Sequence, residues 1–170
     1  MTYDVSSFLD SLKETLVTNA STLSTSLTVN YPTITTDSIH IGNPLRVTPG
    51  VDQYPCIIIT PKNKSSDFDE IGMSSSKVGR QIINNVDILC LTQCMSDDED
   101  ADKQSRTLAR NVENVLDAVV EKPPTTSTVS DGWNMAIVTN AVYDGAYNES
   151  SQIYQSSVRL EAEFTSWGIR

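Results

Sequence analysis

The single histidine and the missing nucleophile motifs limit the chemistry that this sequence can support. Among 170 residues, His40 is the only histidine, and it stands between Ile39 and Ile41 in a short apolar run. A catalytic histidine works beside a nucleophile or a carboxylate. The sequence contains no serine elbow, phosphate-binding loop, dinucleotide-binding glycine pattern or H-E-x-x-H helix. We therefore interpret His40 as a structural or surface residue, and predict that the protein is not an enzyme.

The three cysteines, Cys56, Cys90 and Cys94, do not form the pattern of a disulfide framework or a metal site. An odd number in a chain of this size argues against a set of disulfides. The C-x-x-x-C spacing of Cys90 and Cys94 lacks the nearby third and fourth ligands that zinc requires. Cys56 and Cys90 lie in apolar runs, where a free thiol behaves as a small hydrophobic side chain.

Acidic residues gather where they could be mistaken for a cation site or a catalytic pair. The run from Asp97 to Asp102 lacks the spacing of a calcium-binding loop. It is better explained as the first turn of a helix, with Ser96 and Glu99 forming a capping box. We interpret the remaining acidic pairs as solvated rather than catalytic, namely Asp67 with Asp69 and Glu161 with Glu163.

The charge balance limits the possible partners. Formal net charge is −10, from 22 acidic and 12 basic residues, which argues against a surface that grips nucleic acid through its phosphates. The same charge permits a surface past which DNA slides. No run of residues matches a signal peptide or a transmembrane helix, so we expect the protein to stay in the compartment where it is made, without contact to a membrane.

Hydrophobic periodicity predicts one α+β domain spanning residues 1–170, with a mostly antiparallel sheet covered by two helices and a long projecting loop. Helices are expected over 4–19 and 96–121. Strands are expected at 27–34, 39–41, 56–60, 78–93, 133–143 and 154–165, with a turn at Asp144-Gly145 and a Ser/Thr-rich end of the first helix at 19–26.

The predicted loop spans residues 62–77, because Pro61 is expected to end the preceding strand and the segment is rich in serine and charge. Phe68, Ile71 and Met73 are apolar residues within it. They can fold back onto their own domain or become ordered by a partner, and the sequence leaves both open. We hypothesise an assembly loop, with Asp67, Phe68, Ile71 and Met73 as candidate contacts.

The closing strand has the strongest alternation in the chain. Its apolar face carries Tyr154, Ser156, Val158, Leu160, Ala162 and Phe164. The opposite face carries Arg159, Glu161, Glu163 and Thr165 and is expected to meet solvent or a neighbouring subunit. Arg159, Glu161 and Glu163 are therefore further candidate interface residues.

The order of these elements resembles that of the tail terminator proteins of long-tailed bacteriophages, also called tail completion or head–tail joining proteins. The resemblance rests on a strand ending in Leu-Cys-Leu-Thr-Gln, on a capped helix containing Ala-Arg-Asn-Val-Glu-Asn-Val-Leu, and on the alternating strand at 157–167. It spans nearly the whole chain through element order and pattern rather than through an invariant motif.

The resemblance implies a structural virion protein that forms a ring, typically of six subunits, on top of the tail tube. Such a ring ends tube polymerisation and joins the tail to the connector of the head, while DNA passes through without specific binding. It implies no catalysis and no cofactor, synthesis in the host cytoplasm, and a location in the tail or neck. Another neck or tail tube subunit, a hydrolase with an unfamiliar site, and a non-viral intracellular binding domain remain alternatives.

Overall fold

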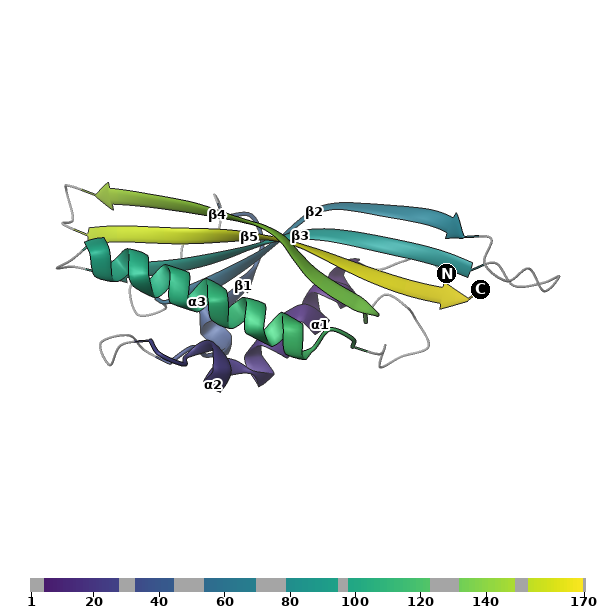
Figure 1. The fold of residues 1–170 in the computed structure, drawn as a ribbon, viewed down its shortest axis with the longest axis horizontal. Helices are drawn as coiled ribbons and strands as arrows, with labels where there is room; N and C mark the ends of the chain where they lie inside the picture. Colours follow the sequence, from purple (N-terminus) through teal and green to yellow (C-terminus); the bar gives the residue numbers. More distant parts are fainter. Residues whose placement is uncertain are drawn as a thin grey trace.

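A computed structural model describes residues 5–27, 33–44, 54–69, 79–94, 98–122, 132–148 and 153–169 (Figure 1). In chain order the elements are α1 Val5–Thr18, α2 Ala20–Leu23, the 3-10 turn η1 Thr36–Ser38, β1 Ile39–Ile41, β2 Cys56–Asp69, β3 Gly79–Cys94, α3 Asp98–Ala118, β4 Met135–Asn148 and β5 Ile153–Ile169. The predicted α+β class is confirmed. Both long helices and the strands at 39–41 and 79–94 lie close to their expected positions.

The sheet has five strands in the order β1-β2-β3-β5-β4. The β1–β2 pair is parallel, whereas the other three pairs are antiparallel, so the sheet is mostly antiparallel as predicted. β3 and β5 pair along 16 consecutive positions, from Gly79 opposite Ile169 to Cys94 opposite Tyr154. This long central pair fixes the register of the outer strands, and it leaves β4 at one edge.

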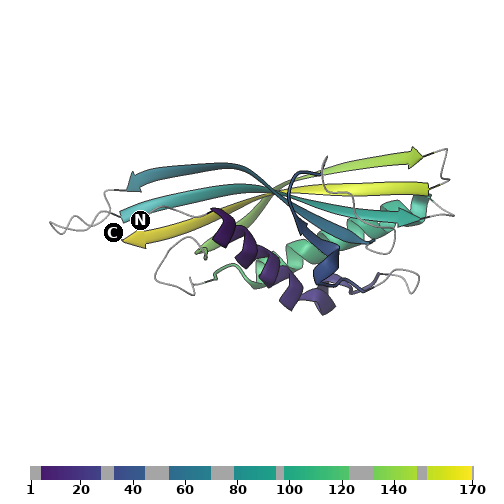
Figure 2. The same ribbon diagram turned by 180° about the vertical axis from the view of Figure 1, so that it is seen from behind.

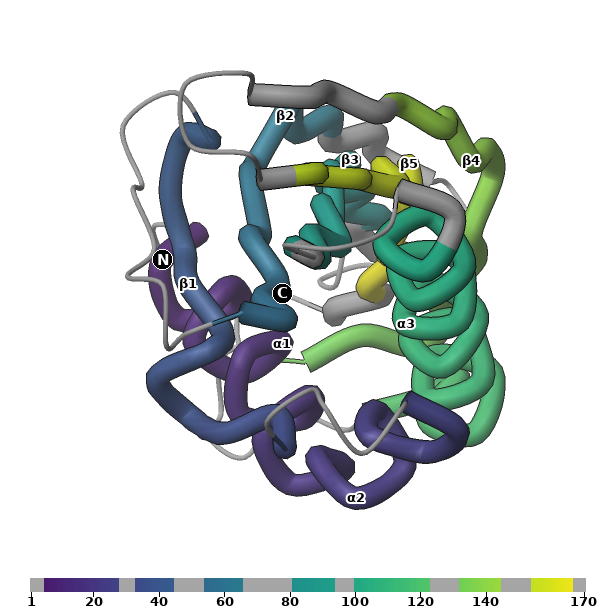
Figure 3. The backbone as a smooth tube through the Cα atoms, turned by 90° about the vertical axis from the view of Figure 1, so that its left-hand side faces the viewer, coloured from purple at the N-terminus to yellow at the C-terminus, as the bar shows by residue number. Residues whose placement is uncertain are grey.

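The helices cover one face of this sheet (Figures 1 and 3), and the view from behind shows α1 and α2 beneath the β1 end (Figure 2). α1 and α3 present apolar stripes that pack on the alternating residues of the strands. The buried side chains of this core include Phe8, Leu12 and Leu16 of α1, Leu108, Val112 and Leu116 of α3, and Ile57, Ile88, Val158, Leu160 and Phe164 of the sheet.

An aromatic cluster holds the end of α3 against α1 and the sheet. The ring of Trp133 lies 6.0 Å from that of Phe8 and 5.2 Å from that of Phe164, in edge-to-face geometry. Trp133 Nε1 donates to the carbonyl of Val119 at 3.1 Å. Trp133 also forms an isolated bridge with Lys122, so β4 begins at Met135 rather than at Trp133 as predicted.

The predicted loop at 62–77 is wrong in its first half. β2 does not stop at Pro61 but continues to Asp69, pairing Asn63 with Asn85 and Phe68 with Arg80. The register shifts between Pro61 and Asn63, so the proline sits at an irregularity that tolerates a residue without an N–H. Pairing with β3 provides hydrogen-bond partners for the backbone N–H and C=O groups of this polar segment. This gain outweighs the weak intrinsic strand propensity of its residues. The rest of the predicted loop, including Ile71 and Met73, lies outside the described residues.

Four smaller predictions also need correction. The Ser/Thr-rich stretch after α1 forms the short helix α2, and the predicted turn at Asp144-Gly145 is instead part of β4. Of the strand predicted at 27–34, the described residues are not in a strand, and residues 28–32 lie outside the described part. Thr165, expected on the exposed face of β5, is 1% exposed.

α3 begins at Asp98 and ends at Ala118, inside the predicted range of 96–121. Ser96 and Asp97, which carry part of the predicted capping arrangement, lie outside the described residues. Among the residues that the structure describes, no helix is both long and apolar enough to cross a membrane.

Candidate functional site

The sheet face opposite the helices carries a polar band. We define this band as Lys62, Asp87, Arg159, Glu161 and Glu163. The register places Asp87 of β3 opposite Glu161 of β5, and Leu89 opposite Arg159. Since Val158, Leu160 and Ala162 are buried on the helix side, the alternation of β5 turns Arg159, Glu161 and Glu163 to the other side. The structure therefore brings together the three candidate residues that the sequence predicted on this strand.

Lys62 is the centre of the polar band. Its Nζ lies 3.0 Å from Glu161 Oε1 and 3.3 Å from Asp87 Oδ1. Lys62 lies between Pro61 and Asn63, where the register of β2 shifts. It therefore does not follow the regular alternation of side chains along the strand. Glu161 also accepts a hydrogen bond of 3.4 Å from Asn140 Nδ2 of β4. One cation thus links acidic residues of two strands on a face that no described helix covers.

These contacts shift the ionisation of both partners. Hydrogen bonding to Lys62, and then to Asn140, lowers the pKa of Glu161 below its ordinary value. Hydrogen bonds to Glu161 and to Asp87 raise the pKa of Lys62. Lys62 is exposed and Glu161 is half-buried, so water screens much of the attraction and the ion pair adds little to folding stability. Its charges remain available to a neighbour.

The loop candidates lie elsewhere. Asp67 and Phe68 are in β2, opposite Gln81 and Arg80, and their side chains lie outside the description. Asp67 is seven residues beyond Thr60, the partner of Asp87, so roughly 23 Å of strand separates it from the polar band. The sequence-predicted residues therefore do not form one contiguous site. Ile71 and Met73 cannot be placed.

The edge strand β4 carries a feature that the sequence analysis missed. Three of its large apolar side chains are exposed: Met135 by 39%, Ile137 by 43% and Tyr143 by 62%. The outer side of β4 pairs with no other described strand. An exposed long edge with apolar side chains is a template for pairing with another chain. The alternation of residues 133–143 predicted a strand, but only the strand order shows that it is an edge.

A groove of about 420 Å³ lies between α3 and the β4–β5 side of the sheet. We call it the α3–β4 groove, and its rim is formed by Lys103, Arg106, Arg110, Glu113 and Tyr143. Ala109, Val158 and Leu160 form its apolar floor. Three of the chain's 12 basic residues therefore line one groove of a strongly acidic protein.

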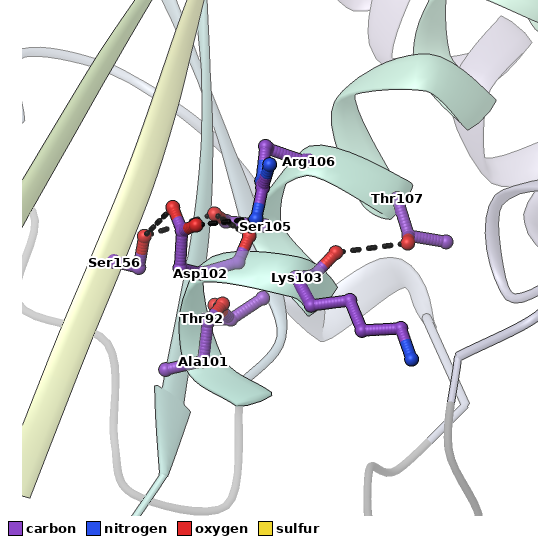
Figure 4. A network of polar contacts seen from close by, with 8 residues as sticks. All are labelled: Thr92, Ala101, Asp102, Lys103, Ser105, Arg106, Thr107 and Ser156. Atoms are coloured by element: carbon purple, nitrogen blue, oxygen red, sulfur yellow. Dashed lines mark hydrogen bonds and ion pairs between the residues drawn. The ribbon is translucent and has the colours of Figure 1, made fainter. Parts of the chain in front are cut away.

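Polar contacts fix the first turns of α3 beside this groove (Figure 4). Thr92 Oγ1 of β3 donates to the carbonyl of Ala101 at 2.6 Å. The hydroxyls of Ser105 and Ser156 lie 3.0 Å apart and join α3 to β5. Arg106 pairs with Asp102 at 2.6 Å, one turn away. The basic wall of the groove is thus attached to the sheet at both β3 and β5.

The residues considered for catalysis or metal binding are placed as follows. Cys56 and Cys90 are buried free thiols, and burial raises the pKa of both, that of Cys56 to about 12. Burial, followed by the charge of Lys13, lowers the pKa of His40. Within the described ranges, no cluster of three or more histidine, cysteine or acidic side chains could hold a metal ion.

The described geometry offers surfaces for protein contact: the polar band, the β4 edge and the α3–β4 groove. Glu161 and Glu163 lie on the polar band, and neither lines the α3–β4 groove. No protein-family model matches the chain, and no curated protein is similar enough to indicate a relative.

Proposed function

We propose that the protein is a structural virion subunit that forms a ring at the top of a phage tail tube. The ring ends polymerisation of the tube and joins the tail to the connector of the head. Its partners are further copies of itself (six in the resembling family), the tail tube protein and the head connector or stopper protein. Genomic DNA passes through the ring without specific binding. The protein acts in the tail or neck and needs no cofactor.

The observation that carries the proposal is the uncovered edge of β4. Its exposed Met135, Ile137 and Tyr143 accompany 14 residues of strand whose outer backbone has no partner in the described chain. Such an edge is stabilised by pairing or by cover from another subunit. The element order that resembles tail terminators gives the kind of assembly, and the net charge of −10 suits a ring through which DNA moves.

The assembly state of the purified chain tests the first part of the proposal. Size-exclusion chromatography with light scattering should give the mass of an oligomer, and negative-stain electron microscopy should show rings. Ile137→Lys should weaken assembly without unfolding the subunit, because a charge on an exposed edge residue opposes apolar contact. Thr33→Lys is the matched control, since Thr33 is exposed ahead of η1 and far along the chain from β4. A chain that stays monomeric at every concentration contradicts the proposal.

Antibody labelling of intact particles tests the location. Label confined to the junction of head and tail supports a terminator. Label spread along the tail identifies a tail tube subunit instead, and label on other parts of the neck identifies a different neck protein. Particles without label exclude a virion role and favour an intracellular binding domain.

A further inference from the structure

The exposed side of α3 is divided by charge. Lys103, Arg106, Arg110, Glu113, Asp117 and Glu121 follow each other at intervals of three or four residues. At 3.6 residues per turn the first five form one stripe on α3, and Glu121 lies three residues beyond Ala118, the last residue of the helix. Glu113 is half-buried and the other five are exposed. The first three are basic and the last three are acidic, so the stripe has a basic half and an acidic half.

Part of this division opposes the stability of the helix itself. Arg106 and Arg110 are like charges four residues apart and repel each other, although Arg106 is also paired with Asp102 one turn earlier. Acidic residues near the carboxyl end also oppose the helix dipole. Lys122 compensates in part, but its Nζ lies 3.6 Å from Glu14 of α1, which adds another acidic group at that end. Opposite charges on a partner outside the helix would offset these unfavourable charge contacts.

Each half of the stripe stands beside an exposed apolar side chain. The basic half lines the α3–β4 groove together with Glu113, the first acidic residue of the stripe, and with Tyr143, which is 62% exposed. In the acidic half, Val120 lies directly before Glu121, just beyond the end of α3, and is 46% exposed. Complementary charges that flank an apolar contact are the arrangement found at specific protein interfaces.

We propose that the α3–β4 groove of one copy binds the acidic half of α3 of a second copy, principally through Arg110 and Lys103 against Asp117 and Glu121. Charge complementarity supports this contact, because the basic and the acidic half lie on the same chain in a protein of net charge −10. A contact between two different surfaces can repeat head to tail with different neighbours, and it then closes into a ring when the rotation between copies allows. This inference rests on the proposed function, to which it adds the contacting surfaces.

Charge reversal tests the contact. Arg110→Glu and Asp117→Lys should each weaken self-association of the full chain roughly tenfold or more, as measured by sedimentation velocity at fixed salt. The double variant Arg110→Glu/Asp117→Lys restores complementarity and should return the affinity to within roughly threefold of the original. Lys64→Glu and Asp37→Lys make the same changes of net charge at other exposed positions and serve as matched controls.

Circular dichroism checks that each variant is folded, and Arg110→Gln should give an intermediate loss if Arg110→Glu unfolds. If the wild type forms rings and Arg110→Glu behaves like Lys64→Glu, the contact is overturned while the proposed function stands. A wild type that never self-associates overturns both. Labelled double-stranded DNA that binds the wild type but not Arg110→Glu, with assembly unchanged, would assign the groove to nucleic acid and overturn the contact.

Discussion

At the scale of single residues, the polar band shows how strand register creates an ion pair between distant parts of the sequence. Lys62 and Glu161 are 99 residues apart, yet Lys62 Nζ and Glu161 Oε1 are within 3.0 Å. Ionised Glu161 is favoured by this contact, so the stabilisation is present above the ordinary pKa of 4.5 and disappears as the pH falls through the lowered value. At alkaline pH the same stabilisation is fully present below pH 10.5, the ordinary pKa of lysine, and is lost as the pH rises through the raised pKa of Lys62.

Replacing Lys62 by methionine should therefore raise the pKa of Glu161 towards its ordinary value, because the largest cause of the lowering is removed. NMR titration of the Glu161 carboxyl carbon measures this directly. Lys64→Met, also exposed on β2, should change the Glu161 pKa much less. An unchanged titration in Lys62→Met would show that the pair does not form in solution.

The buried thiols give a second residue-scale prediction. With its pKa raised from 9.0 to about 12, Cys56 is almost wholly protonated at pH 8. In a Cys94→Ser background, iodoacetamide should label Cys56 and Cys90 slowly in the folded protein and rapidly in urea. Labelling followed by mass spectrometry gives both rates, and fast native labelling of either cysteine would contradict its burial.

At the scale of elements, α3 is held by polar contacts at its start and by apolar packing along its length. Thr92 is 0% exposed, and its hydroxyl is bound to the Ala101 carbonyl within the α3 backbone. The Ser105–Ser156 contact adds a second attachment to the sheet. The α3–β4 groove depends on this rigidity, since its basic wall belongs to the same turns of helix.

Thr92→Val should cost about 1–3 kcal/mol of unfolding free energy, because the buried Ala101 carbonyl loses the hydroxyl donor. Urea denaturation of the dissociated subunit measures the change. Thr107→Val is the matched control: Thr107 is half-buried and its hydroxyl donates within its own helix, to Lys103 at 2.9 Å. A similar loss of unfolding free energy in both variants would show that the hydrogen bond between β3 and α3 does not account for the effect of Thr92→Val.

At the scale of the whole molecule, the sheet is longer than α3, the longest helix that covers it. The 17 residues of β5 extend roughly 56 Å, whereas the 21 residues of α3 extend about 32 Å. Figure 1 shows β2, β3 and β5 continuing past α3 at one end of the sheet. In the part of the chain that the structure describes, strand length beyond α3 and the unpaired outer side of β4 together leave surface that a neighbouring subunit can bury.

Hydrogen exchange should report this burial. Amides on the outer side of β4 should exchange quickly in the dissociated subunit and become protected on assembly, because they pair or lose contact with water only in the ring. β3 lies between β2 and β5 and should be protected in both states. Mass spectrometry of the two strands at high and low protein concentration makes the comparison. Equal exchange of β4 in rings and monomers would remove the edge from the interface.

The sequence by itself determined the α+β class, the two long helices and the two faces of the closing strand. Those features follow from local periodicity, since Leu160 and Val158 must alternate with Arg159 and Glu161 whatever the strand pairs with. It also located Arg159, Glu161 and Glu163 on an outward face. The polar length of β2 after Pro61 was not predictable, because its strand state depends on pairing with β3 rather than on its own propensity.

Only the tertiary structure decided which strand is an edge and which helix residues line a groove. β4 and β5 have similar alternating patterns, but the order β3-β5-β4 buries one between neighbours and exposes the other. Likewise, Lys103, Arg106 and Arg110 are charged helix residues in the sequence, and they become a groove only where Tyr143 of β4 lies beside them. Long-range strand order is set by the sum of many packing contacts, which no local pattern in the chain encodes.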